Sequence, residues 1–335
     1  NIVHMFERDC SVQRRHQKVV ERAPAVFLDD EARSFLCEQG IKIAKTADYQ
    51  CAGTVEFLQD ADSGEVYFIE VNPRIQVEHT VTDWVTGIDL VQAQIRIAAG
   101  GKIGDLESSG VPAQEDIRLY GHAIQCRVTT EDPENNFTPD YGRLSAYRSA
   151  SGFGIRLDAG TAFAGALITR YYDSLLVKVT SWAPDAKSAT NRMDRALREF
   201  RIRGVTTNLR FLETLINHPK FLAADYTTNF IDQTPELFEF PERRDRASRL
   251  LNFVGDVIVN GNPEVKGHAL PAHATQPHAR KFGKAEVKPG TKQLLDDLGP
   301  EKFSQWMLDQ KRVLITDTTM RDAHQSLLAT RVRSK

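Results

Sequence analysis

Residues Gly53–Thr80 have the sequence GTVEFLQDADSGEVYFIEVNPRIQVEHT, which predicts a β-hairpin followed by a polar exit loop. Polar and apolar side chains alternate on both sides of Asp62-Ser63-Gly64, a combination typical of a tight connection between antiparallel strands. Symmetric pairing about Ser63 would place Glu56 opposite Glu70. Facing Cβ atoms on paired strands lie about 4.5–5.5 Å apart, and like charges there repel, so these two carboxylates need a cation. Mg²⁺ binds through one or two carboxylates plus phosphate oxygens, and the hairpin therefore predicts a Mg-nucleotide site.

The exit loop that follows, residues 72–79, carries an unusual mixture of polar groups. It combines the amide of Asn72, a proline bend, Arg74, Gln76 and the carboxylate of Glu78. Arginine offers a planar fork that suits carboxylate-like anions, so the mixture favours a compact anion bound beside the metal. The alternative is a solvated hairpin face that happens to carry two glutamates, and such a face does not need these loop residues.

Composition sets the broad class. The chain has 335 residues, is 41% hydrophobic and 26% charged, which is typical of a soluble protein of two or three domains. A net charge of −2 gives no reason to expect nucleic acid or an anionic membrane surface. No apolar run approaches the roughly 20 residues that span a bilayer. The four cysteines show no metal-ligand spacing, so we expect reduced, intracellular thiols. Since the chain opens at Asn1, without Met, we expect it to be a piece of a longer protein.

Hydrophobic periodicity predicts the main elements. It favours helices over residues 29–47, with Phe35 among the inward side chains, and over residues 84–98. Near the end, the apolar run Val313–Ile315 precedes polar residues, the pattern of a barrel strand at the C-terminal rim of a (β/α)₈ barrel. The remaining predictions are strands at 117–128 and 154–158, helices at 185–200 and 209–215, and a helix at 291–310 interrupted at Gly299-Pro300.

Two groups of motifs carry a family resemblance. GTVEFL and FIEVNPRIQVEHTVTD, with ERDCSVQRRHQKVVERAPA and GHAIQCRVTTEDP, resemble the biotin carboxylase branch of the ATP-grasp superfamily over residues 1–235. TDTTMRDAHQSLLATR resembles the opening of the carboxyltransferase barrel of biotin-dependent enzymes. The two together resemble the layout of the pyruvate carboxylase family. The implied fold class is α+β: a partial ATP-grasp, biotin carboxylase-type domain at 1–238, a linker/allosteric region at 239–311, and the first strand of a (β/α)₈ barrel at 312–335.

The resemblance also implies residue roles. Glu78 matches the general base that deprotonates bicarbonate, and Arg127 matches the arginine that stabilises the enolate form of biotin. The other matches are Lys18, Arg74, Gln76 and Val77 around bicarbonate (Lys18 and Arg74 with catalytic roles); Gln13, His16, Glu56 and Glu70 with ATP; Glu56, Glu70 and Asn72 with Mg²⁺ or Mn²⁺; Asp322 with a barrel Zn²⁺ or Mn²⁺; Arg321 and Gln325 with the barrel substrate; and Arg243, Arg244 and Arg246 with the activator acetyl-CoA. For Arg243, Arg244 and Arg246 the alternative is a solvated run of charges shared with Glu242 and Asp245.

The implied reaction has two stages. ATP phosphorylates bicarbonate to carboxyphosphate, and biotin on a separate carrier domain captures the CO₂ released. The barrel then transfers the carboxyl group to pyruvate, giving oxaloacetate. The resemblance implies a homotetramer in the bacterial cytoplasm or the mitochondrial matrix.

Three departures limit what these residues are expected to do alone. This sequence lacks the family's N-terminal nucleotide-binding subdomain and glycine-rich lid, most of the barrel, and the biotinylated lysine. We therefore expect neither half reaction from this chain by itself. Two other hypotheses stay open at this point: a carboxylase subunit for an acyl-CoA substrate, and a non-catalytic piece that serves tetramer assembly or acetyl-CoA sensing.

Overall fold

The computed structural model describes every residue except 161, 241–245, 262–288 and 317–335, and its contacts divide the chain into two units. One unit holds residues 1–240 and the segment from Lys311 onward, and the other holds residues 241–310. The first unit contains the strands β1 (Asp9–Arg14), β2 (Gln17–Ala23), β3 (Thr54–Gln59), β4 (Val66–Asn72), β5 (His122–Thr129), β6 (Glu131–Asp132), β7 (Thr138–Pro139), β8 (Gly142–Arg143), β9 (Ala146–Arg148), β10 (Ile155–Ala159), β11 (Leu167–Ile168), β12 (Leu175–Ala183) and β13 (Arg201–Arg203). Its helices are α1 (Asp30–Thr46), α2 (His79–Thr86), α3 (Leu90–Ala98), α4 (Leu106–Ser109), α5 (Ala186–Glu199), α6 (Leu209–Ile216) and α7 (Pro219–Ala223), with short 3₁₀ turns at Gln114–Asp116, Pro133–Asn135 and Pro235–Phe238. The second unit contains α8 (Arg246–Asn260) and α9 (Thr291–Leu308), which is kinked at Gly299 as the sequence predicts.

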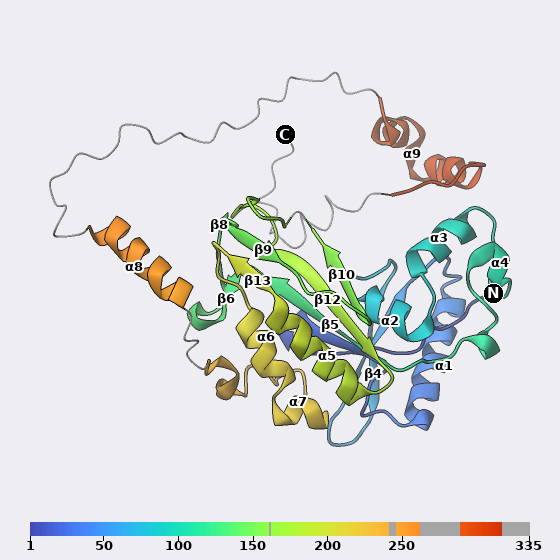
Figure 1. Cartoon of the computed structure of the whole chain (residues 1–335). Helices are drawn as coiled ribbons and strands as arrows, with labels where there is room; N and C mark the ends of the chain where they lie inside the picture. The colour runs from blue at the N-terminus through green and yellow to red at the C-terminus, as the bar shows by residue number, and fades with distance from the viewer. Residues whose placement is uncertain (161, 241–245, 262–288, 317–335) are drawn as a thin grey trace. The chain divides into compact units, whose positions relative to one another are not determined.

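A five-stranded antiparallel sheet, in the order β1-β2-β5-β12-β10, organises the first unit. Helices α5 and α6 pack on one face, where Val20 and Cys126 are buried in the main core (Figure 1). Helix α2 packs on the other face against Ala23 and Ala123. Because side chains alternate along a strand, the neighbours of Val20 and Cys126 point toward α2. The α2 face of the sheet is the one that carries the polar groups of the candidate site.

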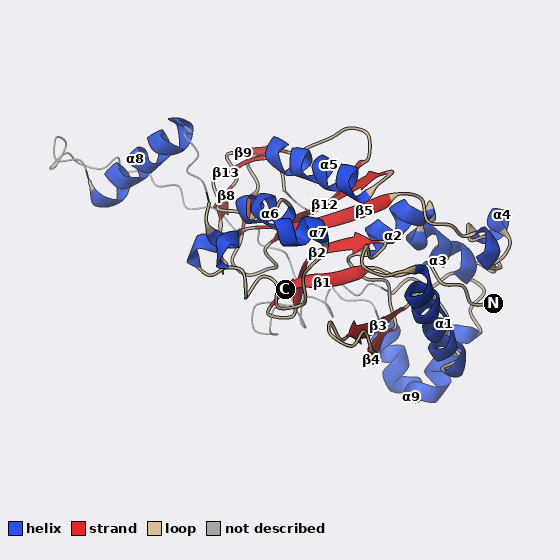
Figure 2. Ribbon diagram, turned by 90° about the horizontal axis from the view of Figure 1, so that it is seen from below, coloured by secondary structure: helices blue, strands red, loops and turns tan. Residues whose placement is uncertain are grey.

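The predicted hairpin is present, with the predicted register at its polar end. Strands β3 and β4 pair antiparallel, with Thr54 opposite Asn72 and Glu56 opposite Glu70, which confirms the sequence prediction. A register shift follows Glu56, so the symmetry does not extend to the turn. Figure 2 shows this two-stranded ribbon beside α1, separate from the five-stranded sheet.

The predicted helix over residues 84–98 is wrong, because two helices occupy this region. Helix α2 ends at Gly87, which adopts a left-handed conformation (φ 71°), and α3 begins after Asp89, whose side chain caps the N–H of Gln92. These local stop and start signals override the apolar periodicity that runs across them. Within the described residues, no helix is long and apolar enough to cross a membrane.

Phe35 was predicted to face inward, but 49% of it is exposed. The inward side of α1 carries Cys37 and Arg33, whose guanidinium contacts Glu7 and the carbonyl oxygens of Ala25 and Leu28. Residues two positions apart lie on different sides of a helix, so burying Arg33 and Cys37 turns Phe35 outward.

The structure contains one strand that was not predicted, and one predicted strand is not seen in the described residues. The polar segment before Lys18 contains strand β1, which sequence patterning did not predict, and its partner β2 supplies its pairing. Conversely, Val313–Ile315 belongs to no strand in the described part of the chain. An inner barrel strand exists only when ladder partners flank it on both sides. The described residues supply none, and the barrel start is therefore not seen.

Truncating the buried ring of Phe211 to alanine is expected to lower the free energy of unfolding by about 3–5 kcal/mol. Phe211 is fully buried on α6, and its ring centroid lies 5.0 Å from that of Phe137 and 5.4 Å from that of Phe238. Chemical denaturation of the chain measures the change. As a matched aromatic control, Phe163→Ala removes a ring that is 61% exposed and should change stability by less than about 0.5 kcal/mol. Equal effects of the two substitutions would contradict this account of the core.

Candidate functional site

The carboxylate of Glu78 is the centre of the site and is almost completely buried. Glu78 is 2% exposed and occupies the N-cap position of α2, directly after the exit loop of the hairpin, without a side-chain capping hydrogen bond. Its Oε1 accepts a hydrogen bond from Lys18 Nζ at 2.7 Å, and its Oε2 accepts one from Arg127 Nη2 at 3.2 Å. A buried carboxylate is stable when cations with good geometry neutralise it, and here two cations from different strands do so.

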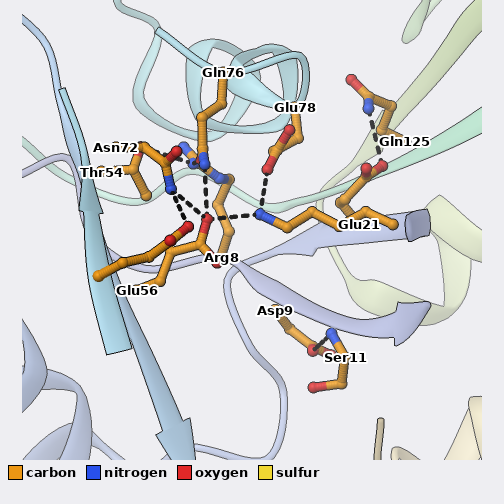
Figure 3. A network of polar contacts seen from close by, with 12 residues as sticks. Arg8, Asp9, Ser11, Glu21, Thr54, Glu56, Asn72, Gln76, Glu78 and Gln125 are labelled. Carbon is orange, nitrogen blue, oxygen red and sulfur yellow. Dashed lines mark hydrogen bonds and ion pairs between the residues drawn. The ribbon is translucent and has the colours of Figure 1, made fainter. Parts of the chain in front are cut away.

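A second carboxylate, Glu56, is tied to the first through Lys18. Its Oε1 accepts hydrogen bonds from Lys18 Nζ at 2.9 Å, Gln76 Nε2 at 2.8 Å and Asn72 Nδ2 at 3.0 Å. The side chains of Glu56, Asn72, Gln76 and Arg8 converge from the hairpin, the exit loop and the N-terminal segment (Figure 3). Arg8 fixes the other end of the Gln76 amide by donating to its Oε1, which holds the loop against the hairpin.

The residues at the end of the hairpin fit a divalent metal that is also bound by phosphate. Glu56 Oε1 accepts from three donors, but Glu56 Oε2 takes part in no hydrogen bond or ion pair among the described residues. Glu70 lies opposite and is exposed, with Oε1 accepting from Asn72 at 2.9 Å. Asn72 presents its amide nitrogen to both carboxylates. No cluster of three or more His, Cys, Asp or Glu side chains that could hold a metal occurs in the described part of the chain. Two carboxylates suit Mg²⁺ or Mn²⁺ when nucleotide phosphates supply further oxygens.

The cations around Glu78 lower the pKa of its carboxyl and so favour its ionised form. Burial acts to raise the pKa of this carboxyl, but Lys18, Arg8 and Arg127 outweigh burial and hold the pKa below its ordinary value. Burial lowers the pKa of the Lys18 ammonium, yet its acidic surroundings raise it overall. Cys10 is also close, but burial raises the pKa of its thiol to about 12, so the thiol is uncharged at neutral pH and does not neutralise Lys18. Glu78 and Lys18 are therefore a carboxylate and an ammonium.

The structure brings some of the remaining predicted residues to this site but keeps others apart. Lys178 Nζ donates to the carbonyl oxygen of Val77 at 2.9 Å, which anchors the exit loop on β12. Arg74 is half-buried and donates to the carbonyl oxygen of Ile75, so its guanidinium is outside the Glu56–Glu78 network. Gln13 pairs with Lys18 across β1 and β2. His16 is exposed in the turn between those strands, with φ 63°.

The other predicted site residues lie outside what the structure describes. These are Asp322, Arg321 and Gln325 at the expected barrel, and Arg243 and Arg244 in the arginine cluster; for Arg246 only the backbone of α8 is described.

Sequence reasoning missed four residues that hold the site together. Arg8 donates hydrogen bonds to Thr54, Gln76 and Thr82. No local sequence pattern indicates that Arg8 holds these residues together. Lys178 anchors the loop from a strand far along the chain. The sequence offered a signal for one of them: the acidic residue Glu21 directly follows the apolar pair Val19-Val20. The missed residues are Arg8, Glu21, Gln125 and Lys178.

Two family models match the first unit. Residues 1–106 match the carbamoyl-phosphate synthase L chain, ATP binding domain, and residues 125–233 match the biotin carboxylase C-terminal domain. The fold is therefore of the ATP-grasp, biotin carboxylase type, with mixed α/β structure. The first model covers the hairpin with its exit loop, and the second covers β12 and the part of β5 from Gln125 onward.

Curated relatives match the chain from end to end. Pyruvate carboxylase of Bacillus subtilis is 53% identical over 334 residues, covering 100% of this chain and 29% of the relative. The mitochondrial human pyruvate carboxylase is 50% identical over 337 residues, covering 100% of this chain and 28% of the relative. The chain thus spans less than a third of the length of these relatives.

Solved structures agree with the sequence matches. The complete multifunctional pyruvate carboxylase from Rhizobium etli has a TM-score of 0.73 and 65% identity, covering 97% of this chain and 30% of that one. A second neighbour is the biotin carboxylase domain of the Hydrogenobacter thermophilus 2-oxoglutarate carboxylase, in complex with MgADP and bicarbonate. It has a TM-score of 0.68 and 42% identity, covering 72% of this chain and 51% of that one. With relatives matched along its whole length at half identity or more, this chain belongs to the pyruvate carboxylase family of biotin-dependent carboxylases.

Proposed function

We propose that the enzyme containing this chain carboxylates biotin at the expense of ATP and bicarbonate, and then transfers the carboxyl group to pyruvate to give oxaloacetate. The observation that carries the proposal is the contact of the buried carboxylate of Glu78 with Lys18 and Arg127, beside the paired acids Glu56 and Glu70. The biotin carboxylase domain that was solved in complex with MgADP and bicarbonate is 42% identical and covers 72% of this chain. The overall reaction is the one its full-length relatives are named for.

The side chains around Glu78 define where bicarbonate would react. Lys18 and, after a modest reorientation, Arg74 offer positive charge to the anion, while the ionised Glu78 accepts its proton on a carboxylate oxygen. The deprotonated oxygen attacks the γ-phosphorus of ATP and ADP leaves. The resulting carboxyphosphate divides into CO₂ and phosphate.

Further residues are proposed to bind the nucleotide with its metal ion and to assist biotin. A Mg²⁺ or Mn²⁺ ion held by Glu56 and Glu70, with Asn72 as a third ligand or in contact with phosphate, would supply charge neutralisation to the phosphates. Biotin, when present, supplies the ureido nitrogen that accepts the carboxyl group, and Arg127 offers its guanidinium to the charge that develops on the ureido oxygen. Gln13 and His16 are proposed to contact the nucleotide from the β1–β2 turn.

The rest of the assignment extends to parts that the structure does not describe. We assign residues 1–238 to the biotin carboxylase domain, 239–311 to the linker/allosteric region and 312–335 to the start of the carboxyltransferase barrel. The barrel would hold a Zn²⁺ or Mn²⁺ through Asp322, with Arg321 and Gln325 toward pyruvate. We also propose a homotetramer with a biotinyl carrier domain and activation by acetyl-CoA through the arginines near 243–246; relatives occur in bacteria and in mitochondria.

The direct test uses the full-length enzyme that contains this chain. With labelled bicarbonate, ATP and Mg²⁺, label is expected to appear in oxaloacetate when pyruvate is supplied, and not in product when acetyl-CoA or propionyl-CoA replaces pyruvate as acceptor. Carboxylation of an acyl-CoA instead of pyruvate would overturn the proposal and support the alternative of an acyl-CoA carboxylase.

The 335 residues alone are expected to show no bicarbonate-dependent ATP cleavage. Phosphoryl transfer depends on positioning and charge neutralisation around the phosphates. The sequence holds the metal and bicarbonate side of the site without the family's glycine-rich lid. Phosphate release from ATP with and without bicarbonate measures this, and turnover by the chain alone would show that the lid is not required.

A further inference from the structure

The carboxylate of Glu21 is completely buried, and the proposed reaction does not use it. Glu21 lies on β2 and points toward the α2 face of the sheet, where burial raises the pKa of its carboxyl and Arg127 opposes that shift. Burying an acid is costly unless its oxygens are paired. A completely buried acid therefore needs partners, and the identity of these partners indicates what the acid does.

Both oxygens of Glu21 are engaged by residues of the neighbouring strand β5. Oε1 accepts from Arg127 Nε at 2.8 Å and lies 2.5 Å from Nη2, and Oε2 accepts from Gln125 Nε2 at 2.9 Å. Figure 3 shows the Glu21–Gln125 contact. A guanidinium is planar, so holding Nε and Nη2 determines the direction of Nη1. No contact among the described residues uses Nη1, so this nitrogen is the one left for a substrate.

The same carboxylate is linked to the helix that begins at Glu78. Gln125 Oε1 accepts a hydrogen bond from Thr80 Oγ, and Thr80 shares a second one with Thr180 at 2.9 Å. Thr80 lies in the first turn of α2, whose N-cap is Glu78. The buried chain Glu21–Gln125–Thr80 thus holds Arg127 and the start of α2 at a set separation, and Arg127 Nη2 contacts both Glu21 and Glu78. Satisfied buried networks of this kind confer rigidity.

We propose that Glu21 is a positioning residue for the carboxylation of biotin: it aligns the Arg127 guanidinium so that Nη1 meets the charge developing on the biotin ureido group. The inference rests on the proposed function. We expect the two halves of the reaction to respond differently, because Glu78 also contacts Lys18 at 2.7 Å, and neither Glu21 nor Arg127 takes part in that ion pair. Bicarbonate activation should therefore continue when Glu21 is altered, while carboxyl transfer to biotin should not.

The test compares Glu21→Gln with a matched control in the full-length enzyme prepared without covalent biotin. Free biotin is then the acceptor, and ATP cleavage without biotin reports the bicarbonate step separately. Glu21→Gln is expected to lower kcat for biotin carboxylation about 10- to 100-fold, since small misalignment of a catalytic group has effects of that size. Bicarbonate-dependent ATP cleavage should change less than about twofold. Asp9→Asn is the control: Asp9 is 4% exposed on the adjacent strand and pairs with Tyr226 rather than with Arg127.

A double-mutant cycle shows whether Glu21 acts through Arg127. In an Arg127→Gln background, Glu21→Gln should change kcat for biotin carboxylation by less than about twofold, because the group it aligns is gone. Independent, multiplicative effects would overturn the inference. So would equal losses of ATP cleavage and biotin carboxylation, or an equal loss in Asp9→Asn, because either would indicate a general structural role. Wild-type enzyme that carboxylates no biotin would instead refute the proposed function, so the two failures are distinguishable.

Discussion

Replacing Glu78 by glutamine in the full-length enzyme is expected to abolish biotin carboxylation, with a fall in rate of about 10²- to 10⁴-fold, while ATP binding is retained. General base catalysis contributes about this factor. Glutamine has nearly the same shape but cannot accept the proton of bicarbonate. It would also leave Lys18 and Arg127 facing a neutral group where each now contacts a carboxylate oxygen. Incorporation of labelled bicarbonate into biotin measures the rate, and nucleotide titration measures binding.

A control for this experiment is Glu131→Gln. Glu131 is a partly buried glutamate that accepts hydrogen bonds from Ser174 at 2.7 Å and Thr129 at 3.2 Å and has no contact with the Glu56–Glu78 network. The Glu131→Gln variant should carboxylate biotin at a rate within about twofold of wild type, because the substitution lies away from the reacting groups. If Glu78→Gln carboxylates biotin at a wild-type rate, Glu78 is not the base.

Replacing Lys18 by methionine is expected to reduce bicarbonate-dependent ATP cleavage about 10²- to 10³-fold, the usual effect of losing one donor aimed at reacting charge. Lys18 Nζ is shared by Glu56 Oε1 and Glu78 Oε1, so its removal leaves two acids without their common cation. Phosphate release at saturating ATP, with and without bicarbonate, measures the effect.

The pH dependence gives a second readout of Lys18→Met. Burial acts to raise the pKa of Glu78, and in the wild-type enzyme Lys18 is the first of the cations that outweigh it. A carboxyl with a lowered pKa stabilises the fold above its unfolded pKa, and that stability is lost as pH falls through the folded value. Without Lys18 the pKa of Glu78 must rise, so the acid limb of the residual activity should move to higher pH.

The control for that shift is Lys187→Met, at an exposed lysine on α5. This variant should keep both the rate and the acid limb of wild type. An acid limb that stays in place in Lys18→Met would show that Lys18 does not set the ionisation of Glu78.

Local patterns explain which parts of the site were predictable. The pairing of Glu56 with Glu70 follows from strand alternation and the position of one turn, both of which are short-range, and the structure has that register. The contact between Lys18 and Glu78 joins residues 60 positions apart, and the contact between Arg127 and Glu78 joins residues 49 positions apart. The spacing of apolar residues along the chain does not indicate contacts between residues so far apart in sequence. Only the family resemblance assigned these residues to one site.

The wrong predictions have the same physical origin. Apolar periodicity joined residues 84–98 into one helix, although Gly87 and Asp89 end one helix and start another. Phe35 was assigned to the interior because it is apolar, whereas ion pairing of Arg33 with Glu7 decided which side of α1 is buried. In each case a specific contact outweighed an average preference.

By itself, the sequence determined the hairpin, its register at the acidic end and the exit loop of mixed polar groups, and its resemblance to a known family suggested the reaction class that we propose. The tertiary structure alone decided how the acids are neutralised: α2 docks on the sheet, so that Lys18 from β2 and Arg127 from β5 reach Glu78, with Glu21 buried behind them. The reason is that hydrogen-bonded registers are set by neighbours along the chain, whereas the pairing of buried charges depends on which faces of distant elements pack together.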